Sequence, residues 1–176
     1  MRCIYMLNLF LPGEYVKNIF EISPMVLKER GVKGIITDLD NTLVEWDRPS
    51  ATPKLIEWFK DVKDHGIAVT IVSNNVEKRV KSFSDPLNIP FIYKARKPMG
   101  KAFRRAVKNM NLEKKDVVVI GDQLLTDVLG GNRNGFHTIL VVPVASTDGL
   151  VTRLNRKIER RILAALKRKG LIQWED

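Results

Sequence analysis

Two carboxylates separated by one residue, Asp38 and Asp40, follow directly on the short apolar run Gly34–Thr37. A β-branched run framed by Gly and by Asp or Asn is typical of a buried strand. Ligands of open α/β sheets bind beyond the carboxyl ends of such strands, so the pair stands where a site would form. The pattern alone also fits a loop that turns the chain and caps a helix. Only polar residues at other strand ends can decide between the two interpretations.

Such residues follow later apolar runs: Ser73, Lys97 and the pair Asp122 and Asp127. Together with the first carboxylate pair they form a set suited to phosphoryl transfer. A phosphate monoester is already anionic, so attack on phosphorus needs a metal ion to neutralise charge and donors to hold the phosphoryl oxygens in line. We therefore expect one phosphoryl-transfer site at the carboxyl edge of a sheet.

The first two carboxylates can have different roles, one in covalent catalysis and the other in proton transfer. Asp38 can attack phosphorus and form an aspartyl-phosphate. Asp40 can protonate the leaving oxygen and later activate the hydrolytic water. The sequence thus predicts one nucleophile and one general acid/base.

The later residues can stabilise charge. Ser73 can donate a hydrogen bond to the transferring phosphoryl group, and Lys97 can offset its charge and limit its repulsion with the nucleophile. Asp122 offers a hard oxygen ligand suited to Mg²⁺, and Asp127 would support or complete that ligand shell. We expect Mg²⁺ as the cofactor.

The elements that must position these residues alternate along the chain. Strands are expected at 32–37, 67–72, 90–93, 117–120 and 137–142, and helices at 15–20, 24–30, 53–66, 76–83, 99–110 and 123–133. This alternation predicts a doubly wound, mostly parallel, Rossmann-like α/β sheet with right-handed crossovers.

The ordered set resembles the haloacid dehalogenase (HAD) superfamily, whose four motifs match Asp38 to Thr42, Ser73, Lys97-Pro98 and Gly121 to Asp127. The resemblance covers roughly residues 34 to 142. It implies a Mg²⁺-dependent enzyme with Asp38 as nucleophile and Asp40 as acid/base. It also implies that Asp38, Asp122 and the backbone carbonyl of Asp40 hold the metal. An Asp at the second position of the first motif is typical of phosphatases and phosphotransferases.

Cap domains of this superfamily enter after the first motif or between the second and third, and neither gap has room here. The stretch 43–72 is filled by one expected helix and one strand, and 74–96 by a short helix and a short strand. The resemblance therefore implies an essentially capless enzyme. Its open site suits a phosphate on a large or surface-bound molecule, unless another subunit provides a lid.

The flanking residues resemble subfamily IIIA, typified by the bacterial YqeG proteins and the mitochondrial phosphatidylglycerophosphate phosphatases. The matching segments are Pro12-x-x-Tyr15-Val16, 34–43 and 121–127. This resemblance implies a phospholipid monoester as substrate. Thr42, Asn74 and Arg96 are further candidates for contact with it.

Length and composition fit one domain: 176 residues, a formal charge of +10 and a single cysteine, Cys3. The length suffices for a hydrophobic core without disulfides, and one cysteine excludes an internal disulfide. The apolar run 3–11 is far shorter than the roughly 20 residues that span a bilayer, so we expect a cytoplasmic protein. We assign 1–149 to the phosphatase domain and 150–176 to a basic C-terminal helix of the same domain.

That helix has basic residues around an apolar stripe: Leu150, Leu154, Ile158, Ile162 and Leu166. The stripe can dock on the sheet while the charges face water. Alternatively, residues 150–169 can contact an anionic membrane peripherally at its inner face. The sequence leaves this choice and the oligomeric state open.

Two other functions fit an open site and a basic surface. One is a phosphatase acting on polynucleotide ends or on protein, and the other is a non-catalytic RNA- or ribosome-associated protein on the same fold. The intact pair Asp38 and Asp40 argues against the second, because loss of either carboxylate would mark a degenerate enzyme.

Overall fold

The computed structural model describes residues 7–145 and 150–172; Cys3 and the boundary at 149 lie outside them. The strands are β1 (Glu14–Val16), β2 (Gly34–Thr37), β3 (Ala68–Val72), β4 (Phe91–Ile92), β5 (Val117–Gly121) and β6 (His137–Val141). The α-helices are α2 (Pro24–Glu29), α3 (Pro53–Asp64), α4 (Glu77–Ser84), α5 (Lys101–Asn109), α6 (Leu129–Arg133) and α7 (Leu150–Arg168). Shorter helical turns are η1 (Ile19–Glu21), η2 (Asp85–Leu87), η3 (Lys114–Asp116) and the π-turn η4 (Leu124–Val128).

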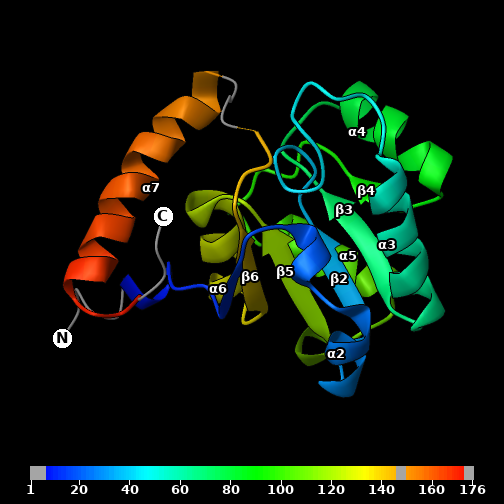
Figure 1. Ribbon diagram of the computed structural model, residues 1–176, viewed down its shortest axis with the longest axis horizontal. Helices are drawn as coiled ribbons and strands as arrows, with labels where there is room; N and C mark the ends of the chain where they lie inside the picture. Colours follow the sequence, from blue (N-terminus) through cyan, green and yellow to red (C-terminus); the bar gives the residue numbers. More distant parts are fainter. Residues whose placement is uncertain (1–6, 146–149, 173–176) are drawn as a thin grey trace.

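The strands form one six-stranded sheet in the order β1-β6-β5-β2-β3-β4, and every pair is parallel. At its centre, Thr37 of β2 lies opposite Ile71 of β3 and Ile120 of β5. The carboxyl ends of these strands therefore meet at one edge of the sheet (Figure 1). The expected parallel α/β fold is confirmed.

Side chains alternate across the sheet and build a core on each face. Ile35 of β2 belongs to a cluster with α2, α3 and α4, whereas the next residue, Ile36, belongs to a cluster with α5. Strands buried on both faces are the rule in parallel sheets covered by helices. The positions of β2, β3 and β5 are thus fixed by packing from both sides.

The N-terminal segment differs from the expected helix. The helical spacing of Tyr15, Val16, Ile19 and Phe20 is misleading: Tyr15 lies in β1, opposite Leu140 of β6. A strand edge offers backbone hydrogen bonds that a short helical pattern cannot outweigh, and Tyr-Val is itself a favourable strand pair. The helix predicted there is wrong.

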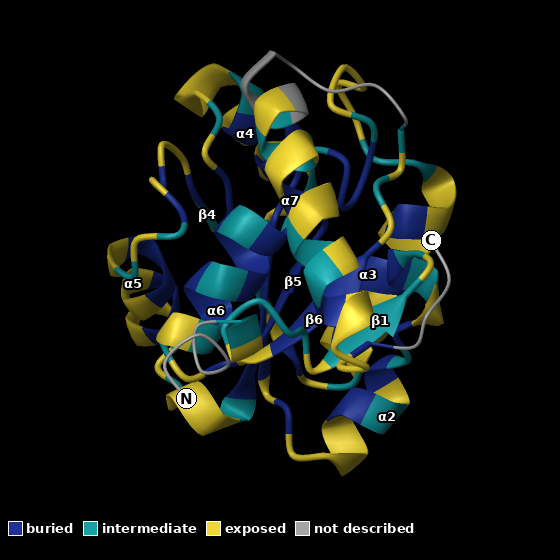
Figure 2. Cartoon of the chain, turned by 90° about the vertical axis from the view of Figure 1, so that its left-hand side faces the viewer, coloured by how far each residue is buried: buried dark blue, intermediate teal, exposed yellow. Residues whose placement is uncertain are grey.

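Helix α7 lies beyond β6 and covers that end of the molecule, as both views show (Figures 1 and 2). Leu166 is fully buried, and Ile162 packs on a small cluster that includes Leu140. Leu154 and Ile158 remain 61% and 42% exposed. The described members of the apolar stripe are therefore divided: Ile162 and Leu166 dock, whereas Leu154 and Ile158 face outward.

No inserted domain lies in either gap where a cap would enter, and the structure describes every residue of both. The loop 38–52 closes on itself through a bridge between Asp40 and Val44, and α4, η2 and β4 fill 74–96. Among the described residues, no helix is long and apolar enough to cross a membrane.

Candidate active site

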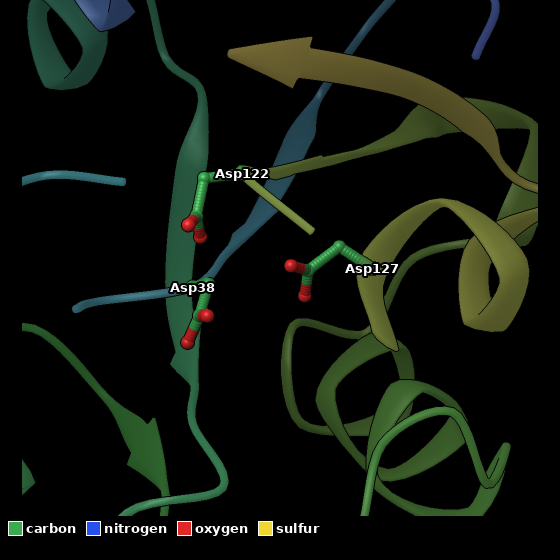
Figure 3. A group of neighbouring side chains, drawn as sticks. All are labelled: Asp38, Asp122 and Asp127. Carbon is green, nitrogen blue, oxygen red and sulfur yellow. The ribbon is translucent and has the colours of Figure 1, made fainter. Parts of the chain in front are cut away.

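Three buried carboxylates meet at the carboxyl edge of the sheet (Figure 3). Asp38 follows β2, Asp122 follows β5, and Asp127 lies in the π-turn η4. One oxygen of each lies within 4.8 Å of one oxygen of both others. Their exposed fractions are 7%, 2% and 2%. Parallel pairing of β2 with β5 explains the approach of the first two.

The third carboxylate fits because β5 ends in a glycine. A Cβ at Gly121 would collide with the side chain of Asp127. The Asp127 carboxylate also accepts hydrogen bonds from the backbone N–H of Gln123 and the hydroxyl of Thr126, both 3.2 Å long. Gly121 thus leaves room for the carboxylate of Asp127, and the next residue, Asp122, supplies a second carboxylate.

Lys97 joins two of the carboxylates. Its Nζ lies 2.9 Å from Oδ1 of Asp38 and 2.7 Å from Oδ1 of Asp127. Burial opposes the charge of this ammonium group, but Asp127 and Asp38 outweigh it and raise the pKa of Lys97. Lys97 therefore remains a cation beside Asp38.

Asn74 fixes the backbone of Lys97. Its side chain accepts a 2.7 Å hydrogen bond from the Lys97 N–H and donates a 3.2 Å hydrogen bond to the Lys97 carbonyl. The oxygen and the nitrogen of the Asn74 amide both bind the Lys97 backbone. Asn74 therefore holds Lys97 in place, although it also lines the cavity.

Asp122 is held by Thr42 and Arg156. The Thr42 hydroxyl donates a 2.8 Å hydrogen bond to Oδ1 of Asp122, and the guanidinium of Arg156 pairs with Oδ2. Burial raises the pKa of Asp122 to about 7, with Arg156 opposing the rise and Asp38 adding to it. Burial likewise raises the pKa of Asp127 to about 6. The cluster carries more negative charge than its environment readily stabilises.

Asp40 lies in a different setting. Its Oδ2 accepts a 2.9 Å hydrogen bond from Asn75, and its Oδ1 lies 2.9 Å from a terminal nitrogen of Arg79. Burial raises the pKa of Asp40, Asn75 lowers it, and Asp38 raises it further. A carboxyl with a raised pKa is suited to carrying a proton near neutral pH.

These groups open into a cavity of about 410 Å³. Asp38, Asp40, Ser73 and Lys97 line it from the sheet edge, with Trp46 at its border. The cavity is also lined by Thr152 and Asn155 of α7. The C-terminal helix is therefore part of the wall of the site, which the sequence does not indicate.

The structure brings together Asp38, Asp40, Ser73, Lys97, Asp122 and Asp127, as their order on the chain predicts. The residues expected at the substrate are distributed differently. Thr42 is fully buried and bonded to Asp122, which favours a role in holding that carboxylate. Arg96 lines a neighbouring cavity that shares Asn74 with the first.

Four residues with clear contacts in the site have no distinctive sequence signal: Asn75, Arg79, Arg156 and Glu159. Arg79 is one of several basic residues in its helix, and Arg156 is one of many in α7. Only the tertiary contacts with Asp40 and Asp122 single them out.

The donor set fits a divalent cation. Three carboxylates within reach of one point supply hard oxygen ligands, which suit Mg²⁺. Burial is the main cause of the raised pKa values of Asp122 and Asp127, and the charge of Asp38 adds to it. A cation there would offset the negative charge of the three carboxylates.

A family model described as HAD-hydrolase-like matches residues 94–153. Over 167 residues the chain is 79% identical to the probable phosphatase YqeG of Bacillus subtilis, covering 95% of this chain and 97% of that protein. It is 32% identical to phosphatidylglycerophosphate phosphatase 1, chloroplastic/mitochondrial, of Arabidopsis thaliana, over 92% of this chain. The chain spans 49% of that plant protein and 55% of a Chlamydomonas reinhardtii relative with a similar name.

Solved structures share the fold. The cobalt-bound deoxy-D-mannose-octulosonate 8-phosphate phosphatase of Haemophilus influenzae superimposes with a TM-score of 0.53 at 16% identity, covering 84% of this chain and 96% of that one. The 3-deoxy-D-manno-octulosonate 8-phosphate phosphatase of Yersinia pestis gives 0.53 at 14% identity, covering 82% and 87%. At these identities the likeness concerns the fold alone.

The raised pKa values predict how stability depends on pH. Both carboxyls titrate above their usual 3.8, so without metal the folded state holds more protons than the unfolded state between about pH 4 and 7. Their contribution is present at low pH and is lost as pH rises through this window, by up to about 1.4 kcal/mol per pH unit for each titrating carboxyl. Urea unfolding in chelator at several pH values measures the slope.

Asp122→Asn removes one of these titrations and should flatten the slope. Asp47→Asn, at an exposed position in the loop after β2, is the matched control and should leave the slope unchanged. If stability depends on pH with the same slope in wild type and Asp122→Asn, the raised pKa of Asp122 would be contradicted.

Proposed function

The chain belongs to the HAD superfamily, within the group that includes Bacillus subtilis YqeG, and it is a phosphatase; from this premise we propose that it is a Mg²⁺-dependent phosphomonoester hydrolase that works through an aspartyl-phosphate on Asp38. The position of Asp38 carries the proposal. Its carboxylate lines the cavity, 2.9 Å from the Lys97 ammonium and beside the other two buried carboxylates.

Asp38, Asp122 and Asp127 would hold the metal together with the backbone carbonyl of Asp40, which the superfamily resemblance adds. The bound ion supplies positive charge that neutralises the phosphoryl oxygens. Lys97 contributes a second, permanent positive charge. Its Nζ lies 2.9 Å from Oδ1 of Asp38, so it lowers the repulsion between this carboxylate and an anionic substrate.

In the first half of the reaction, a carboxylate oxygen of Asp38 attacks phosphorus as the bond to the leaving oxygen breaks. Asp40 gives its proton to that oxygen, so the alcohol leaves neutral. The raised pKa of Asp40 supports this role, because the carboxyl retains a proton at higher pH than an exposed Asp would. Asn75 and Arg79 keep the Asp40 side chain in place.

In the second half, Asp40 takes a proton from water, and the water oxygen attacks the phosphorus of the aspartyl-phosphate. The bond between phosphorus and Asp38 breaks, which releases phosphate and restores the carboxylate. The buried hydroxyl of Ser73 is available to donate to a phosphoryl oxygen. It already accepts a 3.1 Å hydrogen bond from the N–H of Asn75, which orients it.

The substrate we propose is the phosphomonoester of a membrane phospholipid, of the phosphatidylglycerophosphate type. The names of the plant and algal relatives support this choice. So does the absence of an inserted domain from both cap positions in the described chain, since an enclosing cap would exclude a lipid held in a bilayer.

The outward face of α7 offers a route to the membrane. We define it as Leu154, Lys157, Ile158, Arg161 and Arg168, all of which are exposed. Near an anionic bilayer each Lys or Arg contributes about 1 kcal/mol, and shallow insertion of the two apolar residues adds to binding. Thr152 and Asn155 of the same helix line the catalytic cavity, so this contact would hold the site close to the bilayer. We propose a peripheral enzyme acting from the cytoplasm.

The nucleophile is tested with an aryl phosphate. Asp38→Asn should lower kcat by roughly three orders of magnitude or more, because a carboxamide cannot attack phosphorus. Asp47→Asn, an exposed and isosteric change, should stay within about twofold of wild type. Chelator should abolish wild-type hydrolysis, and Mg²⁺ should restore it. Activity that survives Asp38→Asn would refute the proposed nucleophile.

The substrate is tested by a ranking. Wild-type enzyme should release phosphate faster from phosphatidylglycerophosphate in anionic vesicles than from oligonucleotide ends, phosphopeptides or sugar phosphates. Leu154→Ser with Ile158→Ser should slow only the vesicle reaction, whereas Ile56→Ser, at a 48% exposed position on α3, should change neither reaction. A preference for oligonucleotides or phosphopeptides would instead favour the polynucleotide or protein phosphatase.

A further inference from the structure

A second cavity, of about 680 Å³, lies beside the catalytic one, and Asn74 lines both. The mechanism leaves this cavity unused. Four cations line it, namely Lys94, Arg96, Lys101 and Arg105, together with the exposed apolar residues Tyr93 and Met99. Basic and apolar groups next to a phosphatase centre suit an anionic group that carries an apolar extension.

The positive charge in this cavity has no acidic partner in the part of the chain that the structure describes. None of the described residues that line it is acidic. Within 7–145 and 150–172, no side-chain hydrogen bond or ion pair engages any of the four cations. Four cations gathered around one hollow favour a bound anion, and Arg in particular can bind phosphate oxygens in a bidentate manner.

The basic loop is fixed to the catalytic wall. The N–H of Lys94 donates to the carbonyl of Asn75 (2.9 Å), and the N–H of Ala95 donates to that of Ser73 (3.0 Å). Lys94 and Arg96 adopt left-handed backbone, with φ of 45° and 56°. Residues other than glycine rarely adopt this backbone conformation unless surrounding contacts impose it. The cations therefore sit at a fixed offset from Ser73 and Lys97.

We propose that this cavity binds a second anionic group of the same substrate, a phosphodiester, while the phosphomonoester lies at Asp38. Tyr93 and Met99 would contact the adjoining glycerol and acyl carbons. The inference rests on the proposed function for the identity of the substrate, but the second-anion site can be measured separately.

The test uses Arg96→Gln with Arg105→Gln, and Lys108→Gln as the control. Lys108 is an exposed cation of α5 that does not line the cavity. The substrates are a water-soluble, short-chain phosphatidylglycerophosphate and an aryl phosphate that lacks a second anion. The double variant should raise KM for the first by about tenfold or more, since charge-assisted hydrogen bonds are lost. Its kcat, and its KM for the aryl phosphate, should match wild type.

Glycerol bisphosphate and glycerol monophosphate, as competitors of aryl phosphate hydrolysis, separate the two claims. If wild-type enzyme binds the bisphosphate more tightly than the monophosphate and the double variant does not, the second-anion site is supported. Failure to hydrolyse the lipid would overturn only the proposed lipid substrate and would leave this support in place. Equal inhibition constants in wild type and double variant would overturn the site. Loss of binding to phosphatidylglycerol vesicles with unchanged KM for the soluble substrate would also overturn it, because a neighbouring headgroup would then be the ligand.

A separate observation concerns the metal site. Arg156 of α7 donates a 2.6 Å hydrogen bond to the backbone carbonyl of Asp122 and pairs with its carboxylate. Glu159, 3% exposed, accepts a 3.0 Å hydrogen bond from the N–H of Leu125 and lies 3.1 Å from Arg156. The C-terminal helix thus contacts a metal-binding carboxylate and the turn that carries Asp127.

We infer that Arg156 is a positioning residue that sets the affinity of the site for its metal. Its guanidinium neutralises Asp122 when no metal is bound. Two cations on one buried carboxylate repel each other strongly, because the low dielectric screens them little. Metal binding and docking of α7 therefore oppose each other, and linkage makes the effect reciprocal.

Calorimetric titration with Mg²⁺ alone tests this inference. Arg156→Gln should bind Mg²⁺ about 5- to 100-fold more tightly than wild type, a typical range for coupling between sites. Arg156→Lys keeps the charge and should bind like wild type. Arg160→Gln makes the same change at an exposed position of α7 and should also bind like wild type. Saturating Mg²⁺ should speed amide hydrogen exchange in α7 of wild type, and do so less in Arg156→Gln.

Unchanged or weaker Mg²⁺ binding by Arg156→Gln, with circular dichroism like that of wild type, would overturn the inference. If the Gln variant loses helix, the Lys variant decides: tighter binding by Arg156→Lys would show that geometry rather than charge governs the affinity, and would equally overturn it.

Discussion

The structure depends on a buried cluster of three carboxylates, two of which pair with one lysine. Lys97 lies within 3 Å of both Asp38 and Asp127, and all four groups are almost fully enclosed. Such a cluster is stable only when its geometry is fixed and its charges are balanced. Parallel pairing of β2 and β5 fixes the first two carboxylates, the glycine at the end of β5 admits the third, and Asn74 holds the lysine backbone. The remaining negative charge supports our proposal that the site binds a divalent cation.

The surroundings of this cluster govern access to it. The cap positions hold only short connections, so the catalytic cavity is bounded by Trp46 and by α7. The helix plays two parts: Ile162 packs against β6 and η4, while the outward face defined above presents apolar and basic residues to solvent. The same helix reaches Asp122 through Arg156. The wall of the active site depends on how α7 docks, and we propose that membrane contact and metal affinity depend on it as well.

Much of the fold could be predicted from the sequence because buried parallel strands are continuous apolar runs and the polar residues at their ends are local signals. The candidate site residues from Asp38 to Asp127 can be proposed in this way, since each directly follows or lies near such a run. The edge strand β1 was missed, because its partner β6 lies more than a hundred residues away. Arg79 and Arg156 were missed because only tertiary contact separates them from neighbouring basic residues. The resemblance to subfamily IIIA agrees with the high identity to YqeG.

The proposed mechanism requires that Asp38 becomes phosphorylated during turnover. Enzyme mixed with Mg²⁺ and excess substrate, quenched in acid within one turnover and digested, can be examined by mass spectrometry for an aspartyl-phosphate. We expect the phosphoryl group on the peptide that contains Asp38, and we expect it to disappear by hydrolysis once the substrate is exhausted. Phosphate on another residue, or full hydrolysis with no phosphorylated peptide at any quench time, would contradict the mechanism.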